Sequence, residues 1–100
     1  MGRTSKTTAA KIVKLAPDLR IVGAATAFAA LSSAAGERHE RIVLDARKVE
    51  KVDAAGVKAV LAGRAALSAA GKSVEWAGQS TQLESAAELL GLREALGLTK

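Results

Sequence analysis

Two aspartates flank the stretch of this sequence whose residue types could do chemistry. Asp45 ends an apolar run, and Asp53 comes after a short basic stretch, directly before several small residues. Paired carboxylates in a pocket can act as general acid and general base, and covalent catalysis needs a nucleophile beside a base. No such partner accompanies these two residues in the sequence. We therefore expect Asp45 to bond to loop amides, and we expect no enzymatic activity.

The sequence also argues against metal and cofactor chemistry. The chain has no cysteine and a single histidine, His39, within the polar segment Gly36-Glu37-Arg38-His39-Glu40. Without thiolates or a second imidazole, disulfides, cysteine nucleophiles and a plausible zinc site are excluded. No glycine-rich dinucleotide or Walker-type run is present to cradle a phosphate. We expect His39 to be a solvated loop residue and the protein to carry no cofactor and no metal.

The segment after Asp53 is typical of the start of a helix. Asp is a preferred N-cap residue, and its carboxylate can accept from the amide of Ala55 or Gly56 while it meets the positive end of the helix dipole. The small residues Ala54, Ala55 and Gly56 leave that first turn uncovered, so its backbone amides and flat surface can face a partner. The alternative is that Asp53 is only a cap and Gly56 only a close-packing residue.

These residues are positioned by alternating strands and helices. Strands are expected at 11–15, 19–22, 41–45 and 73–76, and helices at 23–35, at 54–70 and from Ser80 or Thr81 to Gly91. A short amphipathic turn with Leu92, Leu96 and Leu98 follows. The order predicts an α/β fold with a small, mixed, four- to five-stranded sheet and crossover helices.

Chain length limits what this fold can contain. One hundred residues make one domain that buries only about two-thirds of its unfolded surface, which leaves little room for a catalytic cavity. We expect a tail at residues 1–9 and a single domain at 10–100. Phe28 and Leu31, three residues apart, should share one side of their helix. The next helix should bury a stripe of Val57, Val60, Leu61 and Leu67.

One segment resembles the signature of STAS domains, the anti-sigma-factor antagonist family. It comprises Ile42-Val43-Leu44-Asp45, Val49 and Val52-Asp53-Ala54-Ala55-Gly56-Val57, and the downstream Ala69-Ala70-Gly71-Lys72, Trp76-Ala77-Gly78 and Leu89-Leu90-Gly91-Leu92 also fit. The resemblance spans about residues 10–98. It implies a regulatory module that binds a protein partner through the turn Asp53-Ala54-Ala55-Gly56 and the helix that follows, including Val57 and Lys58.

The chain departs from the phosphorylated members of this family. In those members a serine or threonine follows the aspartate, whereas here the next two residues are Ala54 and Ala55. Without a hydroxyl, phosphorylation cannot add its charge at this site. The resemblance therefore implies constitutive binding to an anti-sigma-type serine kinase. Other branches of the family leave two further partners open: the ATPase of a phospholipid-transport ABC complex, as for MlaB-like proteins, and a chemotaxis kinase.

The basic residues favour a protein partner over nucleic acid. The net charge is +5, but Arg3, Lys6 and Lys11 lie in or beside the expected tail, and only Phe28 and Trp76 are aromatic. A further cluster near the signature segment consists of Arg47, Lys48, Lys51 and Lys58. It is either a hydrated face or a surface that steers an acidic partner, with Lys51 and Lys58 as binding residues.

The sequence also indicates where the protein works and in what form. No apolar run reaches the roughly 18 residues of a membrane span, and the start of the chain lacks the apolar segment of a secretory signal. We expect a cytoplasmic protein without direct membrane insertion, present as a monomer or weak homodimer.

Overall fold

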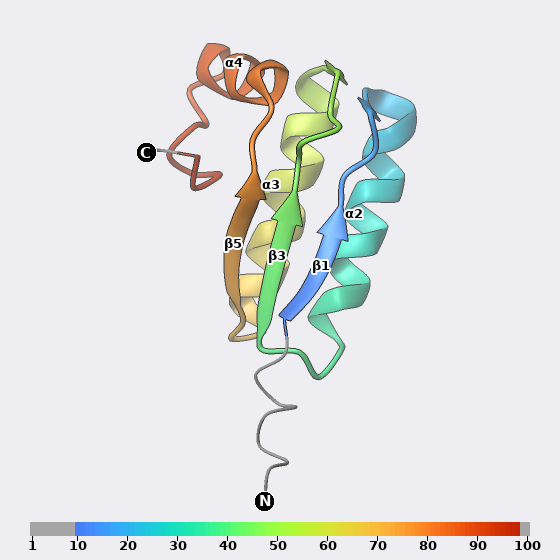
Figure 1. Cartoon of the computed structure of the whole chain (residues 1–100), viewed down its shortest axis with the longest axis vertical. Helices are drawn as coiled ribbons and strands as arrows, with labels where there is room; N and C mark the ends of the chain where they lie inside the picture. Colours follow the sequence, from blue (N-terminus) through green and yellow to red (C-terminus); the bar gives the residue numbers. More distant parts are fainter. Residues whose placement is uncertain (1–9, 99–100) are drawn as a thin grey trace, which may run out of the picture.

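The computed structural model describes residues 10–98; the expected tail at 1–9 and the last two residues lie outside that range. The elements follow one another along the chain in the predicted order (Figure 1), and the structure adds a short strand at Lys51–Val52. In chain order they are β1 (Ala10–Lys14), β2 (Asp18–Leu19), α2 (Ile21–Ala35), β3 (Arg41–Asp45), β4 (Lys51–Val52), α3 (Ala54–Ala69), β5 (Ser73–Gly78) and α4 (Thr81–Leu89).

The α/β fold class with crossover helices is confirmed, but the main sheet is smaller than predicted. It has three strands in the order β1-β3-β5, and β2 and β4 form a separate two-stranded pair. Every strand pair in residues 10–98 is parallel, so the sheet is not mixed. The strands of this pair, β2 and β4, have only two residues each.

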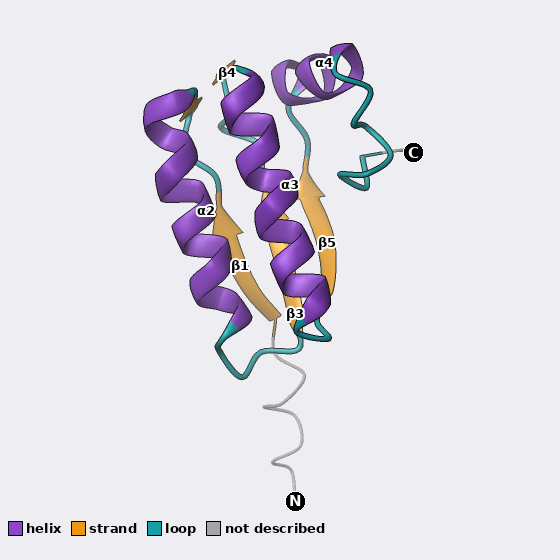
Figure 2. Cartoon of the chain, turned by 180° about the vertical axis from the view of Figure 1, so that it is seen from behind, coloured by secondary structure: helices purple, strands orange, loops and turns teal. Residues whose placement is uncertain are grey.

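Both long helices cover the same face of the main sheet (Figure 2). The core between these layers is aliphatic, with Leu31, Ile42, Leu44, Val60 and Leu67 completely buried. In the centre of β3, Ile42 and Leu44 belong to this core, and Val43 is half-buried. Of the two residues expected on one side of α2, Leu31 is completely buried and Phe28 is 42% exposed.

Close contact between α2 and α3 depends on Gly63 rather than on a continuous apolar stripe. A Cβ at this position would lie 2.4 Å from Cδ1 of Leu31. Gly63 is buried with Val57, Val60 and Leu67, whereas the predicted stripe residue Leu61 is only half-buried. The stripe is therefore completed by a glycine, because a side chain there would push the helices apart.

The C-terminal segment packs against β5 and α3. Leu96 and Leu98 are buried, which confirms the predicted amphipathic turn. The indole nitrogen of Trp76 donates to the carbonyl of Leu96 (2.8 Å), and Nη1 of Arg64 donates to the carbonyl of Ala95 (3.0 Å). Arg64 therefore holds this segment in place. Among the residues described, no helix is long and apolar enough to cross a membrane.

Candidate protein-binding site

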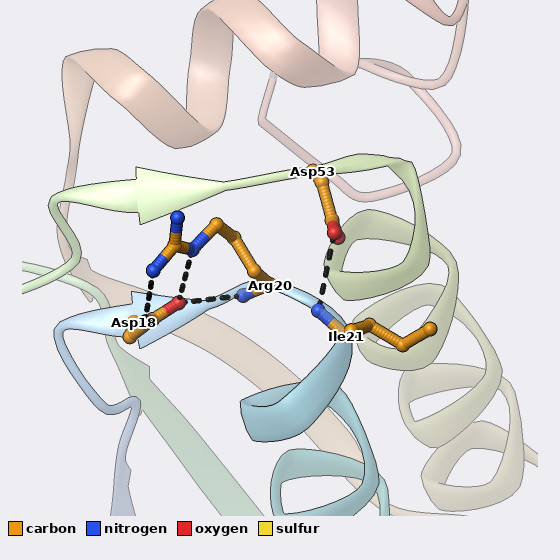
Figure 3. Close-up of polar contacts among 4 residues, drawn as sticks. All are labelled: Asp18, Arg20, Ile21 and Asp53. Carbon is orange, nitrogen blue, oxygen red and sulfur yellow. Dashed lines mark hydrogen bonds and ion pairs between the residues drawn. The ribbon is translucent and has the colours of Figure 1, made fainter.

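The carboxylate of Asp53 joins the starts of two helices (Figure 3). Its Oδ1 accepts a hydrogen bond from the amide of Gly56 (2.9 Å), so Asp53 is the N-cap of α3, as predicted. Its Oδ2 accepts from the amide of Ile21 (3.1 Å), in the first turn of α2. First-turn amides have no partner within their own helix, and the carboxylate also meets the positive ends of both dipoles. Asp53 thereby fixes the two helix starts side by side.

This second bond explains why α2 begins earlier than expected. The β-branched pair Ile21-Val22 favours a strand by composition, but the structure places both residues in the first helical turn. Arg20, just before them, has an extended backbone and no side-chain cap bond. Asp53 supplies that missing acceptor from a distant part of the chain. A residue 32 positions away cannot be identified as a cap from local sequence.

Gly56 is a close-packing residue, as the alternative interpretation held. A Cβ here would lie 1.7 Å from the backbone oxygen of Leu19, so only glycine lets α3 approach β2 this closely. Gly56 and the neighbouring Val57 are both buried. The expectation that these two residues contact a partner directly is therefore corrected, because neither has surface to offer. Gly56 and Val57 instead pack beneath the turn and support its conformation.

The remaining predicted residues do reach the surface. Ala54, Lys58 and Lys51 are exposed, and Asp53 and Ala55 are half-buried. The exposed part of the turn is therefore its first residues together with two lysines.

Sequence reasoning missed two apolar residues beside this turn. Ile21 is 70% and Val22 is 83% exposed, and the Asp53 bond places the start of their helix next to that of α3. Exposure of two consecutive large aliphatic side chains is a feature of interaction surfaces. We call Ile21, Val22, Ala54 and Lys58 the two-helix surface.

An ion pair borders the two-helix surface. Both carboxylate oxygens of Asp18 accept from the guanidinium of Arg20, at 3.0 and 2.8 Å, and Oδ1 also accepts from the Arg20 amide (Figure 3). These bonds lower the pKa of Asp18 to about 2. Lys51 lies opposite Asp18 in the β2–β4 pair. A shallow groove then runs from Arg20 and Lys51 to α4, where Leu89 is almost completely exposed.

The side chain of Asp45 binds Arg47, in the loop after β3, and makes no hydrogen bond to Asp53 within residues 10–98. Its Oδ1 accepts from the amide of Arg47 (3.0 Å), which confirms the predicted bond to a loop amide. The Arg47 guanidinium donates to both Asp45 oxygens, at 3.0 and 2.8 Å. These hydrogen bonds hold the pKa of Asp45 far below its usual range. The two aspartates therefore form no acid–base pair in this conformation.

The depressed pKa of Asp45 predicts a pH-dependent contribution to stability. A carboxylate with a lower pKa in the folded state stabilises the fold above its unfolded pKa, about 3.9, and this contribution fades as the pH falls towards the folded value. We expect Asp45→Asn to lower the urea midpoint at pH 7, and the difference from the wild type to shrink below about pH 4. Glu50→Gln, which removes an exposed carboxylate that makes no ion pair within residues 10–98, is the control. A difference between Asp45→Asn and wild type that is the same at pH 7 and at a pH about 1.4 units below that unfolded pKa, near pH 2.5, would contradict this assignment.

The neighbours of His39 are a carboxylate and a lysine. Its Nδ1 lies 3.6 Å from a carboxylate oxygen of Glu37, and its backbone carbonyl accepts from Nζ of Lys72 (2.6 Å). In the described part of the chain, no three His, Cys, Asp or Glu side chains gather in a way that could hold a metal ion.

The fold and this capped helix start define a class of protein, that of STAS-type α/β domains. The family described as "Mlab, STAS domain" matches residues 3–99, and the chain belongs to it. The fold is shared with the crystal structure of a sulfate transporter family protein from Wolinella succinogenes, with a TM-score of 0.74 and 22% sequence identity over 97% of this chain and 80% of that one. A search of curated proteins gave no match.

Proposed function

We propose that residues 10–100, as a single domain, form a non-enzymatic regulatory module that binds a protein partner through the two-helix surface. The observation that carries this proposal is the exposed pair Ile21-Val22, held beside the uncovered first turn of α3 by Asp53. Interface cores are apolar and their rims are polar. Ile21, Val22 and Ala54 would form such a core.

Two lysines at the border would complete the binding site. Lys51 and Lys58 are both exposed, on β4 and α3. Rim charges mainly raise the rate of association with an oppositely charged surface and its salt dependence. We therefore infer a partner surface that is apolar at its centre and acidic at its edge.

The first candidate partner is a serine kinase of the anti-sigma type. Ala54 offers no hydroxyl at the exposed start of α3, and the half-buried Ala55 offers none either. Binding to such a kinase would be constitutive, because no phosphate can form at this turn to repel the partner.

A second candidate partner is the ATPase subunit of a phospholipid-transport ABC complex. The family description, which names MlaB, favours this partner. A chemotaxis kinase is the third candidate partner. All three partners would meet the protein in the cytoplasm, where we propose that it works as a monomer or weak homodimer.

Ala54→Glu tests the two-helix surface. The side chain is exposed and α3 has no acidic residue in its first turn, so a carboxylate there is compatible with the helix dipole and with folding. It would also bring a charge to the apolar centre and to an acidic partner edge. We expect partner affinity to fall about tenfold or more, equivalent to about 1.4 kcal/mol, measured by titration with the partner recovered by the wild type.

Ala65→Glu is the matched control. Ala65 is also exposed on α3, about three turns further along the helix. The same charge there should leave affinity unchanged. The class of the captured protein, either an ATPase subunit or a kinase, decides between the partners. Equal affinities of wild type and Ala54→Glu, with both folded, would remove this surface from consideration.

A further inference from the structure

A second site lies at the carboxyl ends of β1 and β3 and shares no lining residue with the two-helix surface. It is a cavity of about 330 Å³ lined by Lys14, Leu15, Asp45, Arg47 and Lys48. In open parallel sheets, ligands bind outside the carboxyl ends of the strands. The volume is at the lower end of the range for small-molecule sites.

The lining of this cavity is unequally charged. Three cationic side chains face one carboxylate, and that carboxylate is fully engaged by Arg47. Within residues 10–98, neither Lys14 nor Lys48 takes part in an ion pair. With three cationic side chains and one carboxylate, the lining carries a net positive charge.

Arg47 is held in a fixed orientation. Asp45, only 8% exposed, binds its amide, Nε and Nη2, which leaves Nη1 without a hydrogen bond in the described residues. The side chain lies over Gly78, where a Cβ would be 2.2 Å from Cγ of Arg47. A register shift between Leu44 and Asp45 against β5 places Gly78 opposite Asp45. Such bulges often re-aim side chains next to binding sites.

We propose that this cavity binds the phosphate group of a small phosphorylated ligand. Lys14 and Lys48 supply the point charges, and the free Nη1 edge of Arg47 supplies a directed donor. Leu15 is an apolar wall for the carbon part of the ligand. The phosphate could belong to a soluble molecule or to a lipid headgroup, since both present the same oxygens. This binding does not depend on the proposed protein partner.

Amide chemical-shift titration of the full chain tests the proposal at constant ionic strength. The probes are inorganic phosphate, glycerol 3-phosphate, and phosphatidylcholine vesicles with or without phosphatidic acid. We expect saturable shifts at Leu15 and at residues 45–48. Saturation with glycerol 3-phosphate identifies a soluble ligand, whereas binding only to vesicles with phosphatidic acid identifies a headgroup; either result supports the site.

Three variants separate the site from general attraction to a basic protein. The double variant Lys14→Gln, Lys48→Gln should weaken binding about tenfold or more, because both charge-assisted bonds are lost. Gly78→Ala should weaken it with both lysines intact, because Arg47 must move aside. Arg38→Gln removes one exposed charge from the connection between α2 and β3 and should leave affinity unchanged. Absence of saturable shifts with every probe, or equal affinities in the double variant and wild type, would overturn the proposal.

Discussion

Gly56→Ala is expected to destabilise the domain by about 3 kcal/mol or more, the upper end for overpacking in a protein interior. In an exposed helix the same change would stabilise by about 1 kcal/mol, because alanine has the higher helix propensity. Here the new methyl group would lie 1.7 Å from the backbone oxygen of Leu19. That oxygen belongs to β2, which is paired with β4 through Leu19 and Val52, so it cannot move without disturbing the pair. The steric clash therefore outweighs the gain in helix propensity, and the change in stability is negative.

Urea unfolding measures this effect, and Gly36→Ala is the matched control. Gly36 ends α2 with a negative φ, and a Cβ there would lie 3.7 Å from the nearest backbone oxygen, an ordinary contact. We expect Gly36→Ala to be neutral or slightly stabilising, since it restricts the unfolded chain. If both glycine variants unfold at the same urea concentration, α3 and β2 do not approach as closely as described.

Much of the fold could be predicted because it depends on local patterns. The apolar run at 42–44 indicates the strand β3. Asp53 and Ser80 are N-caps, whose side chains accept hydrogen bonds from amides three residues further along the chain. Gly71 and Gly91, both with positive φ, follow the ends of the helices expected at 54–70 and up to Gly91. In each case the residue that gives the signal and the structure that it specifies are neighbours in the chain.

The features that were missed depend on contacts between distant segments. β4 has two residues and exists only because β2 lies beside it. The burial of Gly56 depends on the Leu19 carbonyl, and the helical state of Ile21 on the Asp53 carboxylate. No local pattern contains these partners. The local sequence around Asp53 therefore indicated the candidate binding site, but no local pattern indicated its apolar part, Ile21 and Val22.

Asp53→Ala is expected to lower the free energy of unfolding by about 2 kcal/mol, the second large effect that we predict. Removing an N-cap costs about 0.5–2 kcal/mol, and here the amide of Ile21 loses its acceptor as well as that of Gly56. Urea unfolding measures the loss. Ser80→Ala provides a comparison, because the Ser80 side chain accepts a hydrogen bond from an amide of one helix only, α4; its hydroxyl also donates to the Val49 carbonyl (2.9 Å).

Asp53→Asn distinguishes a bridge between two helices from a simple cap. Asn and Asp are about equally good N-caps, so a residue that only caps α3 would tolerate the change. An amide, however, has one accepting oxygen and can serve either Gly56 or Ile21, while its NH₂ group faces the other donor. We expect stability between wild type and Asp53→Ala, with faster hydrogen exchange at the Ile21 amide in Asp53→Asn and no change there in Ser80→Ala. Unchanged exchange at Ile21 would mean that the two helix starts are held together by packing alone, and that the exposed pair Ile21-Val22 owes its position to the aliphatic core instead of to this carboxylate.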